Sequence, residues 1–197
     1  MSAVSKTYVD VFRDRVRKSG PNTAIKTKHC GHWEDMSWDQ WSSLSRSLAA
    51  GLVELGLSSG DKVNIQSNTR YEWVITDIGI LLGGGVTVPI YQSNMAEQCQ
   101  FIIDDCDARF IFVEDPEQIA KLVEIRKDVP KIEKVIYFAD SCELAEADSK
   151  GRTTLNLSDV LPEDATDWVI SYEELLTLGA NAINNGGGDE IDRRSDA

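Results

Sequence analysis

The sequence predicts an α/β fold in which helices flank a parallel sheet, and three observations support that prediction. Short apolar segments recur between Lys62 and Phe138. The stretches between them are long enough to hold a helix, as crossovers between parallel strands require. Polar residues that can cap a helix stand at the start of each stretch. Agreement among the three signals favours one sheet built from repeated strand–helix units.

Each apolar segment is an expected strand, and each stretch between two of them is an expected helix. The strands are Lys62–Ser67, Val86–Ile90, Arg109–Val113 and Lys134–Phe138. Each helix is expected to open with a capping box, in which two side chains three residues apart satisfy free backbone N–H groups. The boxes pair Thr69 with Glu72, Asn94 with Glu97, and Asp115 with Gln118, and Pro116 is the first helical residue of the last.

A longer helix is expected ahead of this region. Ser37 and Gln40 form its capping box, and Gly56 supplies a left-handed stop. The residues at helical spacing between these ends are apolar, namely Trp41, Leu44, Leu48, Leu52 and Leu55. This helix is therefore expected to pack on the sheet.

The start of the chain predicts a helix and then a hairpin. The helix covers Tyr8–Lys18, and its inward-facing residues are Val9, Phe12 and Val16. The hairpin arms are Ala24–Lys28 and Trp33–Met36.

Downstream of Phe138 the regular pattern fades. Residues 140–167 are acidic and irregular, and part of this stretch is expected to be disordered. One further helix is expected over Ser171–Leu178, capped by Ser171 with Glu174 and ended by Gly179. We therefore divide the chain into an α/β subdomain, residues 1–179, and a linker, residues 180–197, and interpret it as the N-terminal piece of a longer protein.

The composition limits the class of protein and its partners. The 33 acidic and 20 basic residues give a formal net charge of −13, which argues against a nucleic acid partner. No apolar run reaches the roughly 20 residues of a transmembrane helix, and the first 19 residues carry charges where a secretion signal is apolar. The four cysteines show no paired spacing. A cytoplasmic protein with reduced thiols is expected.

The glycine run and the histidine turn have structural explanations. Gly83–Gly85 precedes a strand, whereas phosphate-binding glycines follow a strand and open a helix. A helix end is therefore the better interpretation. His29, Cys30 and His32 lie on one turn, but a closed zinc site normally takes ligands from two separate elements. We expect no native metal site.

The other reactive side chains also fit structural roles. Cys99 and Cys106 share a helical face with isoleucines, as small buried apolar residues do. Asp104, Asp105 and Asp107 suit a solvated helix end. Tryptophan side chains could form a ligand platform, but packing is the commoner role for those at Trp33, Trp38, Trp41 and Trp73. No catalytic residue is assigned.

Two long segments resemble the N-terminal subdomain of the adenylate-forming (AMP-binding) superfamily. Met36–Asn68 resembles the family's helix followed by a Gly-Asp-x-Val strand, and Tyr71–Val113 resembles its next helix, glycine-rich turn and Val-Pro strand. The long-chain fatty acyl-CoA ligase branch is the one most similar to the stretches Tyr71–Trp73, Val88–Tyr91, Glu97–Gln98 and Glu114–Gln118. Gln92 departs from the pattern, because the family often has proline there.

The resemblance implies a ligase that uses ATP, Mg²⁺ and CoA. Such an enzyme converts a long-chain fatty acid to acyl-AMP with release of pyrophosphate, and the thiol of CoA then displaces AMP. The family's phosphate loop, magnesium-binding acid and catalytic lysine match nothing in this sequence, so this chain alone is expected to be inactive. The family uses the loop after the Val-Pro strand near the nucleotide end of CoA, which makes Tyr91, Gln92 and Ser93 the candidate cofactor-binding residues.

Two other readings remain open from the sequence. The chain could be a non-catalytic α/β module that binds a nucleotide or a protein. It could also belong to another adenylate-forming enzyme, such as an aryl or medium-chain acid CoA ligase. Peripheral membrane contact and self-association through exposed apolar surface are compatible with each reading.

Overall fold

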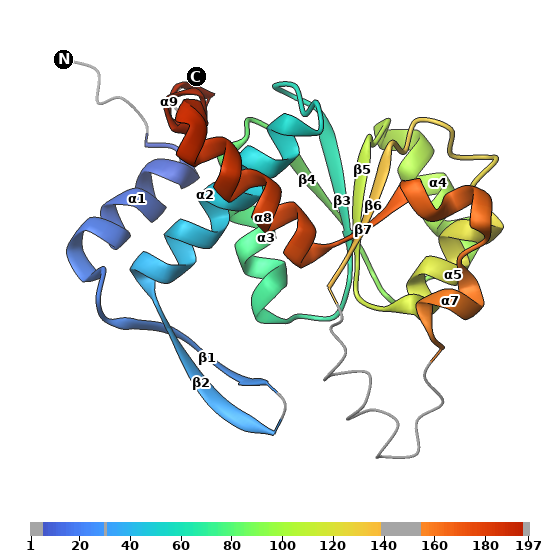
Figure 1. Cartoon of the computed structure of the whole chain (residues 1–197), viewed down its shortest axis with the longest axis horizontal. Coiled ribbons are helices and arrows are strands. Elements are labelled where there is room, and N and C mark those ends of the chain that lie inside the picture. The colour runs from blue at the N-terminus through green and yellow to red at the C-terminus, as the bar shows by residue number, and fades with distance from the viewer. Residues whose placement is uncertain (1–5, 30, 139–154, 195–197) are drawn as a thin grey trace.

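A computed structural model describes residues 6–29, 31–138 and 155–194. Helices cover both faces of a central sheet, further helices form an outer layer on one side, and a two-stranded hairpin projects from the body (Figure 1). The fold class predicted from the sequence is confirmed.

The central sheet has five parallel strands in the order β4-β3-β5-β6-β7. Their bounds are β3 Lys62–Gln66, β4 Val86–Ile90, β5 Phe110–Val113, β6 Lys134–Tyr137 and β7 Val169–Ser171. The four predicted strands are confirmed to within one residue at each end. β7 was not predicted, because a segment of three residues carries too little apolar pattern to be recognised.

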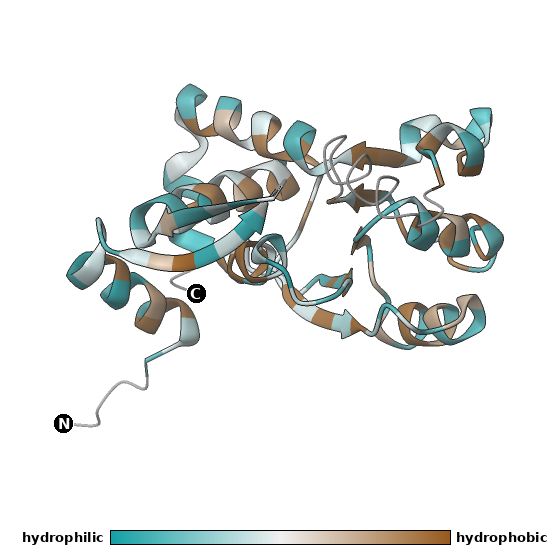
Figure 2. Ribbon diagram, turned by 90° about the horizontal axis from the view of Figure 1, so that it is seen from below, coloured by the Kyte–Doolittle hydropathy of each residue, from teal (hydrophilic) through white to brown (hydrophobic). Residues whose placement is uncertain are grey.

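Helices on the two faces bury two separate cores. α2 (Trp38–Glu54), α3 (Tyr71–Leu82) and α8 (Tyr172–Ala182) pack on one face, and α4 (Ala96–Cys106) and α5 (Pro116–Glu124) pack on the other. The short α7 (Leu157–Val160) and the 3-10 helix η1 (Glu163–Trp168) complete the second layer. Apolar residues gather on the helix sides that face the sheet (Figure 2).

The outer layer was only partly predicted. α1 (Tyr8–Ser19) buries Val9 and Phe12, as expected. The expected linker, however, is helical over its described part: α8 runs on to Ala182, η2 (Ile183–Gly187) continues it, and α9 (Gly188–Arg194) packs beside α1 and α2 (Figure 1).

α9 is held by one apolar side chain and several polar contacts. Ile191 is buried among residues of α1, α2 and α3. Asp192 pairs with Arg46 and with Arg13, and the Arg194 guanidinium donates to the Leu57 carbonyl at 2.7 Å. The linker interpretation failed because a single buried isoleucine does not form a periodic pattern.

Gly179 does not end its helix, contrary to the prediction. It lies inside α8, where a Cβ atom would stand 1.7 Å from the Ser47 carbonyl oxygen and 2.5 Å from the Gly51 nitrogen of α2. A Cβ at Gly51 would in turn meet the Leu175 carbonyl oxygen at 2.5 Å. The glycine therefore serves the close approach of two helices rather than a turn.

Two of the predicted capping boxes were placed one residue early. The N-cap of α3 is Arg70, whose guanidinium pairs with Glu72 through two hydrogen bonds of 2.6 Å. The N-cap of α4 is Met95, whose amide donates to Gln98 Oε1 at 3.0 Å. The boxes at Ser37 with Gln40 and at Ser171 with Glu174 are confirmed.

The hairpin is formed by β1 (Thr23–His29) and β2 (His32–Ser37), as predicted. Trp33 on β2 is 72% exposed, so it does not pack in a core. Trp38 and Trp41 do pack, with their rings stacked 5.2 Å apart beside Phe12.

The glycine run and β4 together shape one side of the sheet. Gly83 caps the end of α3 and Gly84 has a positive φ of 82°, which confirms the helix-end interpretation. The Val86 amide donates to the Asp61 carbonyl next to β3. Successive residues of a strand direct their backbone N–H and C=O groups to opposite sides, so those of Thr87 and Pro89 face the outer side of β4. Pro89 has no N–H to offer there.

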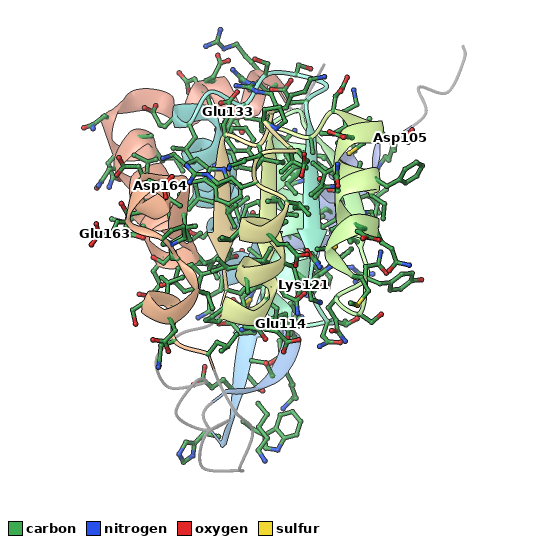
Figure 3. The ribbon with its side chains drawn as sticks, turned by 90° about the vertical axis from the view of Figure 1, so that its right-hand side faces the viewer. Asp105, Glu114, Lys121, Glu133, Glu163 and Asp164 are labelled. Carbon is green, nitrogen blue, oxygen red and sulfur yellow. The ribbon has the colours of Figure 1, made fainter. Side chains whose placement is uncertain are left out.

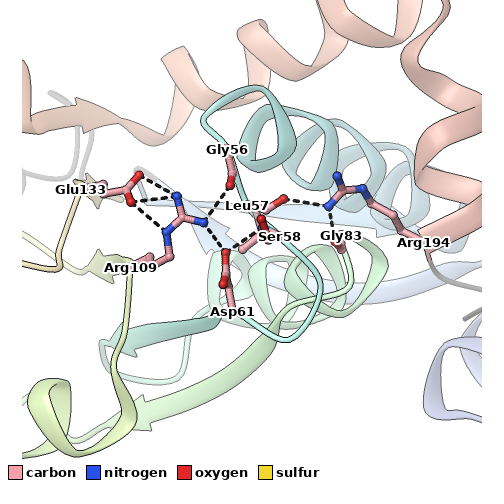
Figure 4. Close-up of polar contacts among 8 residues, drawn as sticks. All are labelled: Gly56, Leu57, Ser58, Asp61, Gly83, Arg109, Glu133 and Arg194. Carbon is pink, nitrogen blue, oxygen red and sulfur yellow. Dashed lines mark hydrogen bonds and ion pairs between the residues drawn. The ribbon is translucent and has the colours of Figure 1, made fainter.

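The amino edge of the sheet is closed by a network around Arg109 (Figure 4). Its guanidinium pairs with Asp61 and Glu133 and donates to the Gly56 carbonyl at 2.8 Å. Figure 4 shows Arg194 reaching the neighbouring Leu57 carbonyl from α9. This edge therefore joins β3, β5 and β6 to the end of the chain that the structure describes.

Candidate functional site at the carboxyl edge of the sheet

The strand order places the candidate site at the carboxyl ends of the strands. The chain moves from β3 to β4 on one side and then crosses to β5 on the other side of β3. In open α/β sheets, ligands bind outside the carboxyl ends of the strands, near the point where the order reverses. That point lies between β3 and β5, one strand away from the predicted residues.

The predicted residues form an exposed loop that leaves β4. We define the β4–α4 loop as residues 91–95. Tyr91 is 81% exposed, Ser93 is exposed and Gln92 is half-buried. The Asn94 amide donates to the Tyr91 carbonyl at 3.0 Å, which closes a tight turn. The loop thus offers an aromatic face and a hydroxyl to solvent.

Lys121 binds the backbone of this loop through hydrogen bonds. Its ammonium group donates to the Gln92 carbonyl at 2.9 Å, to the Asn94 carbonyl at 3.1 Å and to Gln118 Oε1 at 3.0 Å. Lys121 comes from α5, so the loop after one strand is tied to the helix after the next. Sequence reasoning missed this residue, because a single lysine on a helix carries no signal of its partners.

Gln118 connects Lys121 to the end of β3. The Gln66 side-chain amide donates to Gln118 Oε1 at 3.1 Å and to the Cys99 sulfur at 3.2 Å. Gln118 had been expected to complete a capping box with Asp115. The Asp115 carboxylate does accept from the Gln118 amide at 3.1 Å, but the Gln118 side chain turns toward Gln66 and Lys121 instead.

Gln66 leaves one buried polar atom without a partner. The residue is 0% exposed, and its Oε1 accepts no hydrogen bond from the described residues. The orientation of the amide follows from its neighbours, because Lys121 can only donate and so fixes Oε1 of Gln118 as the shared acceptor. Such an unpaired atom costs stability and is uncommon inside a folded domain.

A second pair of residues lies at the reversal point itself. The Glu114 carboxylate accepts from the Asn68 amide at 2.8 Å and from its side-chain Nδ2 at 3.0 Å. These bonds bridge the ends of β3 and β5. Glu114 and Lys121 lie toward one end of the sheet, and Glu133 lies toward the other (Figure 3). Neither Asn68 nor Glu114 was a predicted site residue.

The two thiols of α4 fit the structural role expected of them. Cys99 is fully buried in the core between the sheet and α4, and burial raises the pKa of its thiol. Cys106 is half-buried, and burial raises the pKa of its thiol as well. A raised pKa keeps both thiols protonated and poorly nucleophilic at neutral pH.

The described residues do not fit the phosphates of ATP with Mg²⁺. All three donors of Lys121 are occupied by protein oxygens, and Glu114 adds negative charge at the same edge. Across residues 6–29, 31–138 and 155–194, no group of three or more His, Cys, Asp or Glu side chains could hold a metal ion. Cys30 of the histidine turn lies outside the described residues, and the absence of a native metal site stays a prediction.

Comparison of the sequence with known proteins identifies relatives. A family model described as AMP-binding enzyme matches residues 12–172. The long-chain-fatty-acid–CoA ligase ACSBG2 of Xenopus laevis is 30% identical over 85% of this chain, and the long-chain-fatty-acid–CoA ligase FadD15 of Mycobacterium bovis is 39% identical over 56% of it. The aligned parts make up only 23% and 18% of those two relatives.

Solved structures with the same fold include a CoA ligase and a carboxylic acid reductase. The anthranilate CoA ligase AuaEII, solved with anthranoyl-AMP, matches 89% of this chain and 28% of its own with a TM-score of 0.70 and 19% identity. A didomain of the carboxylic acid reductase from Segniliparus rugosus, solved with AMP, matches 90% of this chain and 27% of its own, with a TM-score of 0.69 and 14% identity. These likenesses show the fold.

No helix in the described part of the chain is long and apolar enough to cross a membrane. The family model covers most of the chain and includes every strand of the central sheet. The match ends at Tyr172, so nearly all of α8 and the segment that follows it lie outside the match. On that match the chain belongs to the AMP-binding enzyme family.

Proposed function

We propose that this chain is the N-terminal part of a long-chain fatty acid CoA ligase. Such an enzyme would use ATP to convert a fatty acid to acyl-AMP and would then pass the acyl group to the thiol of CoA. The observation that carries the proposal is the similarity to long-chain-fatty-acid–CoA ligases over most of the chain, at 30% identity to the Xenopus laevis protein. ATP, Mg²⁺, CoA and a long-chain fatty acid are the proposed cofactors and substrates.

In this proposal the chain contributes a binding edge and leaves the chemistry to a later part of the protein. Tyr91, Gln92 and Ser93 would contact the nucleotide end of CoA, supported by the exposure of the Tyr91 ring and the Ser93 hydroxyl at the carboxyl edge. Aromatic faces stack on bases, and hydroxyls accept or donate hydrogen bonds to ribose and phosphate. Adenylation depends on electrostatic stabilisation of a transferring phosphate, and the described residues do not fit that task.

The location and associations of the protein follow from the same proposal. We place the enzyme in the cytoplasm, where ATP and CoA are available, with peripheral membrane contact for a substrate that partitions into lipid. Self-association of the isolated chain would arise through exposed apolar side chains such as Met95 and Phe101.

The test compares the 197-residue chain with the longer protein that contains it. Both are incubated with ATP, Mg²⁺, CoA and palmitate, and pyrophosphate exchange and acyl-CoA are measured. We expect turnover only from the longer protein, because charge stabilisation and positioning at the phosphate must act together.

The choice of acid separates the proposal from its closest alternative. Palmitate, octanoate and benzoate are supplied in competition, and we expect palmitate to have the highest kcat/KM. Turnover by the 197-residue chain, a preference for benzoate, or no turnover by the longer protein with any acid would each contradict the proposal.

A further inference from the structure

We propose that Lys121 is a positioning residue, which fixes the β4–α4 loop in the conformation that binds CoA. The proposal rests on the function proposed above, since it assumes that this loop meets CoA. Lys121 would touch neither CoA nor the reacting atoms. It would act through the backbone of the loop that carries Tyr91, Gln92 and Ser93.

The ammonium group of Lys121 is fully engaged by the protein. Its three donors meet three acceptors at 2.9, 3.1 and 3.0 Å, and all three acceptors are neutral oxygens. An ammonium group has three donors and no acceptor, so no donor is left for a ligand. The geometry therefore points to a scaffold role rather than to direct binding of a phosphate.

Two of these bonds determine how the loop faces solvent. The Gln92 and Asn94 carbonyls are both directed at Lys121, on the side of α5. Tyr91 precedes Gln92, and Ser93 lies between Gln92 and Asn94. Both Tyr91 and Ser93 remain exposed. The same contact explains why α4 begins later than its sequence pattern predicts, because Asn94 is held in the turn while Met95 becomes the N-cap.

The third bond anchors Lys121 itself. Gln118 Oε1 accepts from both Lys121 and the fully buried Gln66 at the end of β3. Gln118 is also fixed at the start of α5, since its amide donates to the Asp115 carboxylate. The lysine is thus supported by β3, the strand beside β4, and its position is fixed independently of the loop.

The shape of an ammonium group gives the proposal a distinctive consequence. Three acceptors converge on one nitrogen atom, which suits the tetrahedral donors of lysine. Arginine carries its donors in a planar fork and presents them in different directions. If Lys121 acted only through its positive charge, Lys121→Arg would preserve function. We expect that Lys121→Arg instead resembles Lys121→Met.

Hydrogen exchange of the 197-residue chain tests the hold on the loop. We expect Lys121→Met to speed exchange of the Asn94 amide roughly tenfold or more, because the loop loses two charge-assisted hydrogen bonds. Amides in β5 and β6 should keep their rates. Lys127→Met is the matched control, since Lys127 is exposed and has no recorded partner in the described part of the chain.

Steady-state kinetics of the longer protein test the link to CoA. We expect Lys121→Met and Lys121→Arg to raise the KM for CoA about tenfold, as when only a tenth of the loop population is competent to bind. The KM values for ATP and fatty acid, and the rate of pyrophosphate exchange, should stay within twofold of the wild type. Tyr91→Ala is the benchmark, with a raised KM for CoA and unchanged loop exchange.

The possible results separate this inference from the proposed function. Unchanged exchange in Lys121→Met, full rescue by Lys121→Arg, or faster exchange without a change in the KM for CoA would each overturn the role of Lys121. A wild-type longer protein that makes no acyl-CoA would overturn the proposed function and the assignment to CoA with it. In that case the exchange experiment still decides whether Lys121 holds the loop.

Discussion

Single residues in this chain are used where two pieces of backbone must meet. Gly179 and Gly51 let α8 and α2 approach so closely that neither helix has space for a methyl group at the contact. Lys121 has the opposite role, since it bridges a loop and a helix. Two of its hydrogen bonds reach carbonyls of the loop, and the third reaches Gln118 of its own helix. In both cases the residue type follows from geometry that involves a distant segment.

Gly179→Ala should destabilise the chain strongly. The new Cβ would stand 1.7 Å from the Ser47 carbonyl oxygen, and backbone on both sides cannot yield easily. We expect the free energy of unfolding, measured by urea denaturation, to fall by about 3 kcal/mol, at the upper end of what overpacking costs. Thr177→Ala, at an exposed position of α8, is the control and should change it by less than about 0.5 kcal/mol. A stability loss below about 1 kcal/mol would contradict the close contact.

Whole elements were predicted best where their pattern is local. The strands at Lys62 and Val86 and the helix after Ser37 follow from apolar spacing and caps that lie within a few residues. α9 was missed because its stability comes from contacts with Arg46 and Leu57, more than 130 positions away in sequence. The start of α4 shifted for a similar reason, since Lys121 of α5 holds Asn94. The start of α3 shifted through a local pair, Arg70 with Glu72.

Asp192→Asn should loosen α9 in a pH-dependent way. The hydrogen bond and the charge of Arg46 hold the pKa of the Asp192 carboxyl below its usual 3.8. A lowered pKa adds stability above pH 4, which is lost as the pH falls through the folded-state value. The side chain is half-exposed, so we expect a loss of no more than about 1 kcal/mol at pH 7.

The measurement for α9 is urea denaturation of wild type and Asp192→Asn at several pH values. The difference in unfolding free energy should shrink as the pH falls below about 4 and the Asp192 carboxylate of the wild type is protonated. Asp128→Asn serves as the control, because its exposed carboxyl has no recorded partner in the described residues. A difference that stays constant with pH would mean that the charge of Asp192 contributes nothing.

At the scale of the whole molecule, the two edges of the sheet differ in how their polar groups are used. The amino edge is closed by ion pairs that join Arg109 to Asp61 and Glu133. The carboxyl edge carries the exposed β4–α4 loop and the unpaired Gln66 oxygen. From the sequence, the fold class predicts a site at this carboxyl edge, and that location stays a prediction. Lys121, Asn68 and Glu114 could not be found, because their partners lie on other strands and helices.

Arg109→Met tests this division between the edges. It leaves the Asp61 and Glu133 carboxylates without their common partner, so we expect the free energy of unfolding to fall by about 2 kcal/mol. The KM for CoA of the longer protein should not change, since Arg109 lies at the opposite end of the sheet from the loop. Lys121→Met provides the comparison, with the larger effect on CoA. An increase in the KM for CoA of Arg109→Met would mean that the two edges are coupled.

Pro89 has a consequence for how the protein behaves in a crowded solution. β4 is the outermost described strand on its side, and an open strand edge can template growth of a sheet from one molecule to the next. On the outer side of β4 the alternation presents the backbones of Thr87 and Pro89, and proline supplies no donor there. An incoming strand would therefore find one N–H where it needs two. The chain can keep an apolar strand at its margin without offering a full ladder for cross-β assembly.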